Sequence, residues 1–178
     1  VVVTDSRDFR RVYTPTGDRQ YRSPEGYSGG SVGLTYYKTM PGLGTSPSDE
    51  PYNYYIPLRA ITVDLDNDGK YELLVNRPIS TAATFFQRYR YYPQGEIHAL
   101  FWDGVGLNLR WKTRRIKGSI ADFSVADVDN DGVKDLVVCV NTHPGVSGVE
   151  HRRTMILAYP LETRMIGDTK VDKAFREE

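Results

Sequence analysis

The chain has 178 residues, with 23 Lys and Arg residues against 23 Asp and Glu residues and a formal net charge of zero. This balance removes the whole-chain electrostatic case for binding nucleic acid or an anionic membrane, and no apolar run approaches the roughly 20 residues of a membrane-spanning helix. One cysteine excludes a disulfide framework and a cysteine-based zinc site, whereas 16 Gly, 10 Pro and 13 Tyr residues favour an all-β chain rich in turns.

The N-terminal third of the chain predicts short strands separated by long loops. Residues 1–5 (VVVTD) match the strand that follows each acidic segment described below, so we expect a strand here and a chain that begins within a repeat. Residues 13–30 and 40–53 are rich in Gly, Pro, Ser and Asp and are predicted to be loops. Residues 26–30 fit the pattern G-x-S-x-G around Ser28, but a nucleophile elbow needs a strand before it and a helix after it. A loop is therefore the better interpretation.

Two short acidic segments give the strongest signal in the sequence. Residues 63–75 read VDLDNDGKYELLV and residues 126–138 read ADVDNDGVKDLVV, so both follow D-x-D-N-D-G-x-x-[DE]. Each segment lies between two alternating or apolar stretches, 60–64 and 73–76 in one copy and 123–127 and 136–140 in the other. This arrangement predicts an antiparallel hairpin with a nine-residue acidic turn, repeated once.

Further strands complete the repeat. Residues 31–37, 96–102 and 154–159 alternate between apolar and polar side chains, and Asp103-Gly104 predicts a hairpin turn into residues 105–111. Four strands in about 60 residues is the size of one β-propeller blade. We therefore expect an all-β fold of antiparallel four-stranded propeller blades, about two and a half repeats over residues 1–160. The repeat boundaries fall near 5–77 and 78–141, with a partial copy at 142–160 and a charged tail at 161–178 that is either a short helix or disordered.

The acidic turns have the chemistry of calcium loops. Ca²⁺ takes six to eight oxygen ligands, and Asp side chains at alternate positions of a tight turn can all face inward. Positions one, three, five and nine supply carboxylates, position six is the glycine of the sharp turn, and position seven supplies a backbone carbonyl. The predicted ligands are Asp64, Asp66, Asp68, Lys70 and Glu72 in one loop and Asp127, Asp129, Asp131, Val133 and Asp135 in the other.

Electrostatics favours bound metal at both turns. Four carboxylates within nine residues repel one another unless a cation neutralises them, and two such turns predict two structural Ca²⁺ sites. Asn67 and Asn130 are expected to brace the turns. An EF-hand loop carries a Glu at position twelve and lies between two helices. Here position twelve is Val75 in one loop and Val138 in the other, and strands are predicted on both sides of each loop, so an EF-hand is excluded.

This loop between two strands, repeated at about 60 residues, resembles the VCBS/FG-GAP repeats of integrin-α-type β-propellers over about residues 55–160. The resemblance implies a calcium-stabilised propeller, of a kind found in secreted or surface proteins that bind proteins or glycans. The Phe-Gly and Gly-Ala-Pro elements of the fuller motif are missing, and Asp122-Phe123-Ser124 stands where Phe-Gly is expected. The VCBS-like branch is therefore favoured, and integrin-like ligand binding is unsupported.

Other features leave alternatives open. The basic residues Arg110, Lys112, Arg114, Arg115 and Lys117 form either a solvated face or a contact for an anionic partner. The tyrosine clusters at 36–37, 52–55 and 89–92 are either packing between blades or a contact surface. Cys139, in an apolar strand, is expected to be a small buried side chain. The histidines have no partners in sequence.

These observations predict a non-enzymatic, calcium-binding module outside the cell or at its surface, with the periplasm as an alternative compartment. Its partner would be another protein chain or a surface glycan, contacted by loops within 13–30, 40–55 or 85–95, with no nucleic-acid partner. Two alternatives remain: a structural subunit of a multi-chain assembly joined through open blade edges, and an accessory domain of a polysaccharide-degrading enzyme. We expect no catalysis, because no acids or histidines converge in the sequence outside the metal loops.

Overall fold

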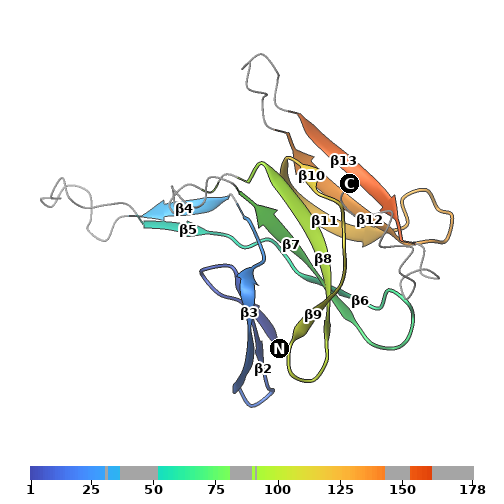
Figure 1. Cartoon of the computed structure of the whole chain (residues 1–178). Coiled ribbons are helices and arrows are strands. Elements are labelled where there is room, and N and C mark those ends of the chain that lie inside the picture. Colours follow the sequence, from blue (N-terminus) through green and yellow to red (C-terminus); the bar gives the residue numbers. More distant parts are fainter. Residues whose placement is uncertain (31, 37–51, 81–89, 91, 143–152, 162–178) are drawn as a thin grey trace, which may run out of the picture.

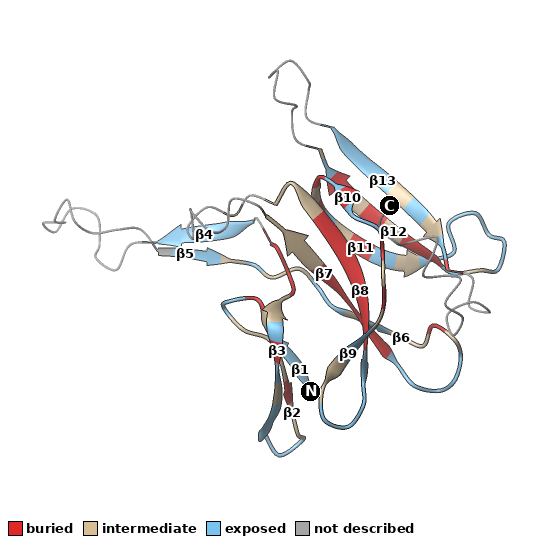
Figure 2. Ribbon diagram, viewed as in Figure 1, coloured by how far each residue is buried: buried red, intermediate tan, exposed pale blue. Residues whose placement is uncertain are grey.

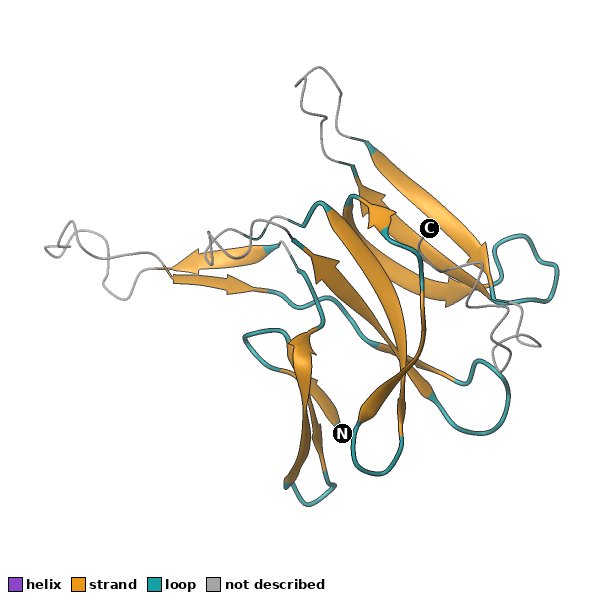
Figure 3. Ribbon diagram, in the orientation of Figure 1, coloured by secondary structure: helices purple, strands orange, loops and turns teal. Residues whose placement is uncertain are grey.

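The protein is all-β, as the sequence predicts. The computed structural model describes residues 1–30, 32–36, 52–80, 90, 92–142 and 153–161. All regular structure in these residues is β-strand, and every paired strand is antiparallel to its neighbour (Figures 1 and 3). None of the described residues forms a helix long and apolar enough to cross a membrane.

The N-terminal part forms two small sheets. Strands β1 (Val2–Thr4), β2 (Phe9–Tyr13) and β3 (Arg19–Gly26) pair in that order, and β1 is the edge strand. Strands β4 (Gly33–Tyr36) and β5 (Tyr52–Tyr55) form a separate two-stranded sheet that extends from the body of the molecule (Figure 1). The strand predicted at the start of the chain is therefore confirmed.

The central sheet has five antiparallel strands, and the predicted repeat boundary near residues 77–78 falls inside its second strand rather than between sheets. It contains β6 (Ile61–Val63), β7 (Glu72–Ile79) and β8 (Gln94–Trp102), in the order of the chain. On the far side of β8, β9 (Leu107–Lys112) and β10 (Ile116–Lys117) pair with its two ends in turn. The predicted hairpin at Asp103-Gly104 is confirmed, and Gly104 has the positive φ of 99° that favours glycine in this turn.

The last sheet repeats the start of the central one. Strands β11 (Ser119–Ala126), β12 (Asp135–Asn141) and β13 (Thr154–Pro160) pair consecutively, with β13 at the edge. No sheet of the described residues closes on itself, so antiparallel sheets are observed and a closed propeller is not.

The buried residues of the central sheet lie mainly in β7 and β8 (Figure 2). Successive side chains of these strands point to opposite faces of the sheet and enter two different apolar clusters. On one face Leu74 and Ile97 pack with Phe123 and Val138 from the β11–β13 sheet. On the other face Leu73, Val75 and Leu100 pack with Tyr27, which follows β3. The central and last sheets thus stack through an apolar layer, and a smaller apolar cluster joins the central sheet to the segment that follows β3.

The loop predicted at residues 13–30 is wrong, and most of the loop predicted at residues 40–53 lies outside the described residues. Residues 13–30 are not a long loop, because they contain β3. This strand (RQYRSPEG) has few apolar residues and half of its residues are exposed, so it has no alternating pattern and depends on pairing with β2. The predicted loop at 40–53 lies outside the described residues except for Tyr52 and Asn53 in β5, and the charged tail lies outside them except for Leu161.

Two candidate metal centres

The two acidic turns lie at equivalent places in two sheets. Loop 1 (residues 64–72) joins β6 to β7, and loop 2 (residues 127–135) joins β11 to β12. Position nine of each loop is the first residue of the strand that follows. The position-four asparagines, Asn67 and Asn130, have φ values of 57° and 62°, and the glycines two residues later have 82° and 87°. Asn and Gly tolerate this left-handed conformation best, which explains why the N-D-G sequence forms this turn.

The hydrogen bonds of the two loops are the same, position by position. The carboxylate at position one accepts the N–H groups of positions five and six, at 3.2 and 2.9 Å in loop 1 and 3.2 and 3.0 Å in loop 2. The carboxylate at position five accepts the N–H of position seven at 2.7 Å in both loops. The carboxylate at position nine accepts the N–H of position two at 3.0 Å in both. The repeated sequence therefore encodes a repeated geometry.

Each loop brings three carboxylates together. Oxygen atoms from positions one, three and nine lie within 4.8 Å of one another, from Asp64, Asp66 and Glu72 in loop 1 and from Asp127, Asp129 and Asp135 in loop 2. Three converging carboxylates form a donor set of hard oxygen atoms, which suits Ca²⁺ or Mg²⁺ rather than a metal that prefers nitrogen or sulfur. The residues present therefore fit a divalent cation at both loops.

The remaining predicted ligands stay predictions. Asp68 and Asp131 fall outside the two groups of three, and each accepts a hydrogen bond from the backbone of its own turn. Lys70 and Val133 were expected to contribute only their carbonyl oxygens. Their N–H groups are the donors to Asp68 and Asp131.

The surroundings of the two loops differ at position two. Leu65 is fully buried and belongs to the core between the central and last sheets, whereas Val128 at the same position is 51% exposed. The position-nine carboxylates, Glu72 and Asp135, are both buried. Loop 1 is therefore attached to the core by a side chain that loop 2 lacks.

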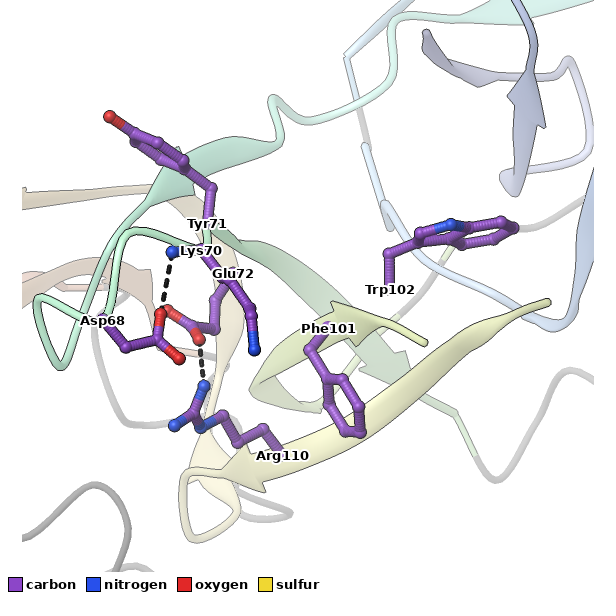
Figure 4. A pocket seen from close by; sticks show the side chains of 7 residues that line it. All are labelled: Asp68, Lys70, Tyr71, Glu72, Phe101, Trp102 and Arg110. Carbon is purple, nitrogen blue, oxygen red and sulfur yellow. Dashed lines mark hydrogen bonds and ion pairs between the residues drawn. The ribbon is translucent and has the colours of Figure 1, made fainter. Parts of the chain in front are cut away.

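A second difference is a basic residue at loop 1. The Arg110 side chain extends from β9 and forms ion pairs with Asp66 and Glu72, of which Figure 4 draws the pair with Glu72. In the part of the chain that the structure describes, no Lys or Arg forms an ion pair with the three gathered carboxylates of loop 2. Arg110, Lys70, Phe101 and Trp102 also line a hollow of about 460 Å³ beside loop 1.

The basic run is divided between partly exposed and exposed side chains. Arg110 and Lys112 belong to β9 and are only partly exposed, and Lys112 lies 3.3 Å from the buried carboxylate of Glu96. Arg115 lies 3.6 Å from the same carboxylate but is itself exposed, as are Arg114 and Lys117. Both interpretations of the run, a solvated face and a contact for an anionic partner, stay predictions.

Sequence reasoning missed a buried cluster on β8. The His98 Nε2 atom lies 2.8 Å from the Glu96 carboxylate, and the His98 ring packs edge-on against Tyr27. Burial lowers the pKa of His98, although the bond to Glu96 opposes this. Burial would raise the pKa of Glu96, but the bond to His98 and the charge of Lys112 outweigh it and lower that pKa.

The i, i+2 spacing of Glu96 and His98 on a strand was the available signal, because such residues share one face. The pair is almost fully buried, and it lies within the packing between β8 and Tyr27. We interpret it as a structural hydrogen-bonded pair.

Ser28 is a structural residue. Its side chain is fully buried, and its hydroxyl oxygen accepts the N–H of Leu58 at 2.7 Å. A strand precedes it, contrary to the prediction, but a strand and not a helix follows it. The flanking Gly30 is required by close packing, since a Cβ atom there would lie 2.0 Å from the carbonyl oxygen of Ile56. A nucleophile elbow is therefore excluded.

Two smaller predictions are resolved in part. Cys139 is half-buried rather than buried, since β12 turns it toward the less covered face of its sheet. Tyr36 and Tyr54 are exposed on the β4–β5 sheet, and Tyr92 is half-buried. Tyr37, Tyr89 and Tyr91 lie outside the described residues.

Comparisons with protein-family models, with curated proteins and with solved structures found no match. The fold and the two turns define the class on their own. This is an all-β protein of stacked antiparallel sheets with two carboxylate turns that could each hold a metal ion.

Proposed function

We propose that the protein is a non-enzymatic, calcium-binding module of β-propeller type that acts outside the cell and binds a protein or a glycan. The observation that carries the proposal is the identical hydrogen-bond pattern of two carboxylate turns on equivalent hairpins. One acidic turn is a common surface feature, but two copies with the same three converging carboxylates indicate a shared requirement for a cation.

The choice of Ca²⁺ follows from the ligand chemistry. Ca²⁺ accepts six to eight oxygen ligands in a flexible geometry, whereas Mg²⁺ demands a near-ideal octahedron and keeps several waters. In each loop three carboxylates, the position-seven carbonyl and water would supply such an irregular oxygen shell. The role is structural, because each turn closes a hairpin and its position-nine carboxylate begins a buried strand.

The stacking of the sheets supports the propeller type. Adjacent propeller blades pack face to face through apolar layers, and each blade has about four antiparallel strands. The central sheet is antiparallel throughout, packs on one face against the last sheet and contacts Tyr27 on the other.

The interaction role rests on the exposed side chains of the β4–β5 sheet. Leu34, Tyr36, Tyr54 and Ile56 are each more than half exposed on this projecting element. Exposed aromatic and aliphatic side chains on a supported sheet are typical of contact surfaces.

Thermal unfolding with and without Ca²⁺ tests the calcium function. Binding to the folded state alone adds about 2.7 kcal/mol per site at a hundredfold excess over Kd, or about 5–11 °C in Tm for a chain of this size. Chelation should remove this gain, and the double variant Asp66→Ala, Asp129→Ala should lose the response to Ca²⁺. An unchanged melting curve with chelator in the wild-type protein would refute the proposal.

A structural subunit of a multi-chain assembly is the second candidate. Strands β1 and β13 are edge strands of their sheets, and Val2, Val3 and Ile156 on them are exposed. Edge strands with apolar side chains invite pairing with another chain. Light scattering decides between the two candidates, because the assembly requires a mass well above that of one chain, whereas a glycan array and a monomeric mass would favour the interaction module.

A further inference from the structure

Arg110 distinguishes the two loops, because it pairs with carboxylates of loop 1. Loops 1 and 2 share their hydrogen bonds and their three gathered carboxylates, yet only loop 1 has a guanidinium paired with two of those carboxylates in the described residues. Asp66 and Glu72, the partners of Arg110, are also two of the three predicted metal ligands that come together. A guanidinium and a divalent cation would therefore use the same two carboxylate groups.

The strand geometry directs Arg110 toward loop 1. In the β8–β9 pairing Ala99 lies opposite Trp111 and Leu100 lies opposite Leu109, so Arg110 is the extra residue of a β-bulge. A bulge changes the direction in which a side chain points, and bulges are frequent beside functional sites. Only 23% of the Arg110 side chain is exposed, which places its charge at the acidic turn and away from bulk water.

The buried carboxylate of Glu72 explains the need for a partner. Its side chain is 1% exposed, and an ionised carboxylate at such a site is costly unless it is paired. Arg is always charged and matches two carboxylate groups with its fixed fork of donors. Arg110 thus offsets part of the negative charge of loop 1, whereas the described surroundings of loop 2 supply no such cation.

We propose that Arg110 is an internal counter-cation of loop 1 that competes with Ca²⁺, so that loop 1 binds Ca²⁺ more weakly than loop 2. This inference rests on the proposed calcium function. Its consequence is a graded response, in which loop 2 fills at low Ca²⁺ concentration and loop 1 fills only at a higher one. Filling of loop 1 requires the guanidinium to give up Asp66 and Glu72, beside the hollow that it lines with Phe101 and Lys70 (Figure 4).

Calorimetric titration with Ca²⁺ tests the inference on the full chain. Asp129→Ala leaves loop 1 as the measured site, and Asp66→Ala leaves loop 2. We expect the Kd of loop 1 to be at least tenfold higher than that of loop 2. Adding Arg110→Gln to the Asp129→Ala protein should lower the Kd of loop 1 at least tenfold, and Arg110→Lys, which keeps the charge, should lower it less.

The matched control is Arg59→Gln. Arg59 is an exposed arginine that pairs with Asp122 outside both acidic turns, so this change should leave the Kd of loop 1 unaltered. Far-UV circular dichroism of each variant checks the fold. If Arg110→Gln fails to fold, the comparison of the two loops with Arg110 intact still decides.

The outcomes separate the inference from the proposed function. Equal Kd values for the two loops, or an Arg110→Gln variant with unchanged or weaker binding at loop 1, overturn the role of Arg110 and leave the calcium function standing. Absence of Ca²⁺ binding at both loops overturns the two together.

Discussion

Removal of the position-nine carboxylate should cost the two hairpins very different amounts of stability. In the presence of a chelator, Glu72→Ala deletes the acceptor of a buried hydrogen bond from the Leu65 N–H and one of the two partners of Arg110. An unsatisfied buried donor costs about 1–3 kcal/mol, and bonds to charged groups lie at the upper end. We expect a loss of about 3 kcal/mol, or about 6–12 °C in Tm.

The equivalent change in loop 2 serves as the control. Asp135→Ala removes a hydrogen bond from the Val128 N–H that is only partly buried, so that water can replace the acceptor. We expect a loss of about 1 kcal/mol, at the low end of the range for a single hydrogen bond.

Urea unfolding in chelator, followed by tryptophan fluorescence, measures both values. Glu72→Gln keeps an acceptor of similar shape and should recover most of the loss. Equal losses in the two alanine variants would refute the claim that burial and Arg110 make loop 1 the more tightly held turn.

Two further changes test the packing and the buried cluster. In chelator, lowering the pH from about 7 to about 5 should destabilise the protein by at most about 1.4 kcal/mol per pH unit. The reason is that the pKa of His98 is lowered in the folded state, so His98 binds a proton more tightly when the chain is unfolded. The pKa of the Glu96 carboxylate is also lowered, so its protonation adds a further loss of stability at lower pH. His98→Gln should flatten the plot of unfolding free energy against pH near neutrality, and an unchanged slope there would contradict the role of His98. Gly30→Ala should cost about 3 kcal/mol in urea unfolding because its Cβ would meet the backbone oxygen of Ile56 at 2.0 Å. Gly26→Ala, whose nearest atom is at 3.6 Å, should cost less than about 1 kcal/mol, and similar losses in both would argue against the close contact.

The acidic turns could be predicted because their geometry is local. Every hydrogen bond within loop 1 joins residues at most seven apart, and Asn67 and Gly69 supply the left-handed conformations themselves. The strands on either side of each turn could be predicted from alternating side chains and from runs of branched apolar residues. In the structure these apolar runs form the buried parts of β7 and β12. Sequence alone was sufficient here.

The partners of the turns could not be predicted, because they depend on register. Arg110 is separated from Glu72 by 38 residues and reaches it only through a bulge in the β8–β9 pairing. No pattern in the sequence marks that bulge. Strand β3 was missed for a related reason, since its residues are polar and its pairing with β2 rather than its own composition holds it extended.

The burial of Leu65 has a consequence for how the hairpins open. This side chain joins the first acidic turn to the apolar layer between two sheets, so the turn cannot detach without exposing part of that layer. Local opening of this hairpin should therefore require nearly the full free energy of unfolding, as in the most protected segments of a domain. The second turn has the exposed Val128 at that place and can open at much smaller cost. Two turns that are alike in sequence and in hydrogen bonding thus belong to different cooperative units, one inseparable from the core and the other free to fluctuate on its own.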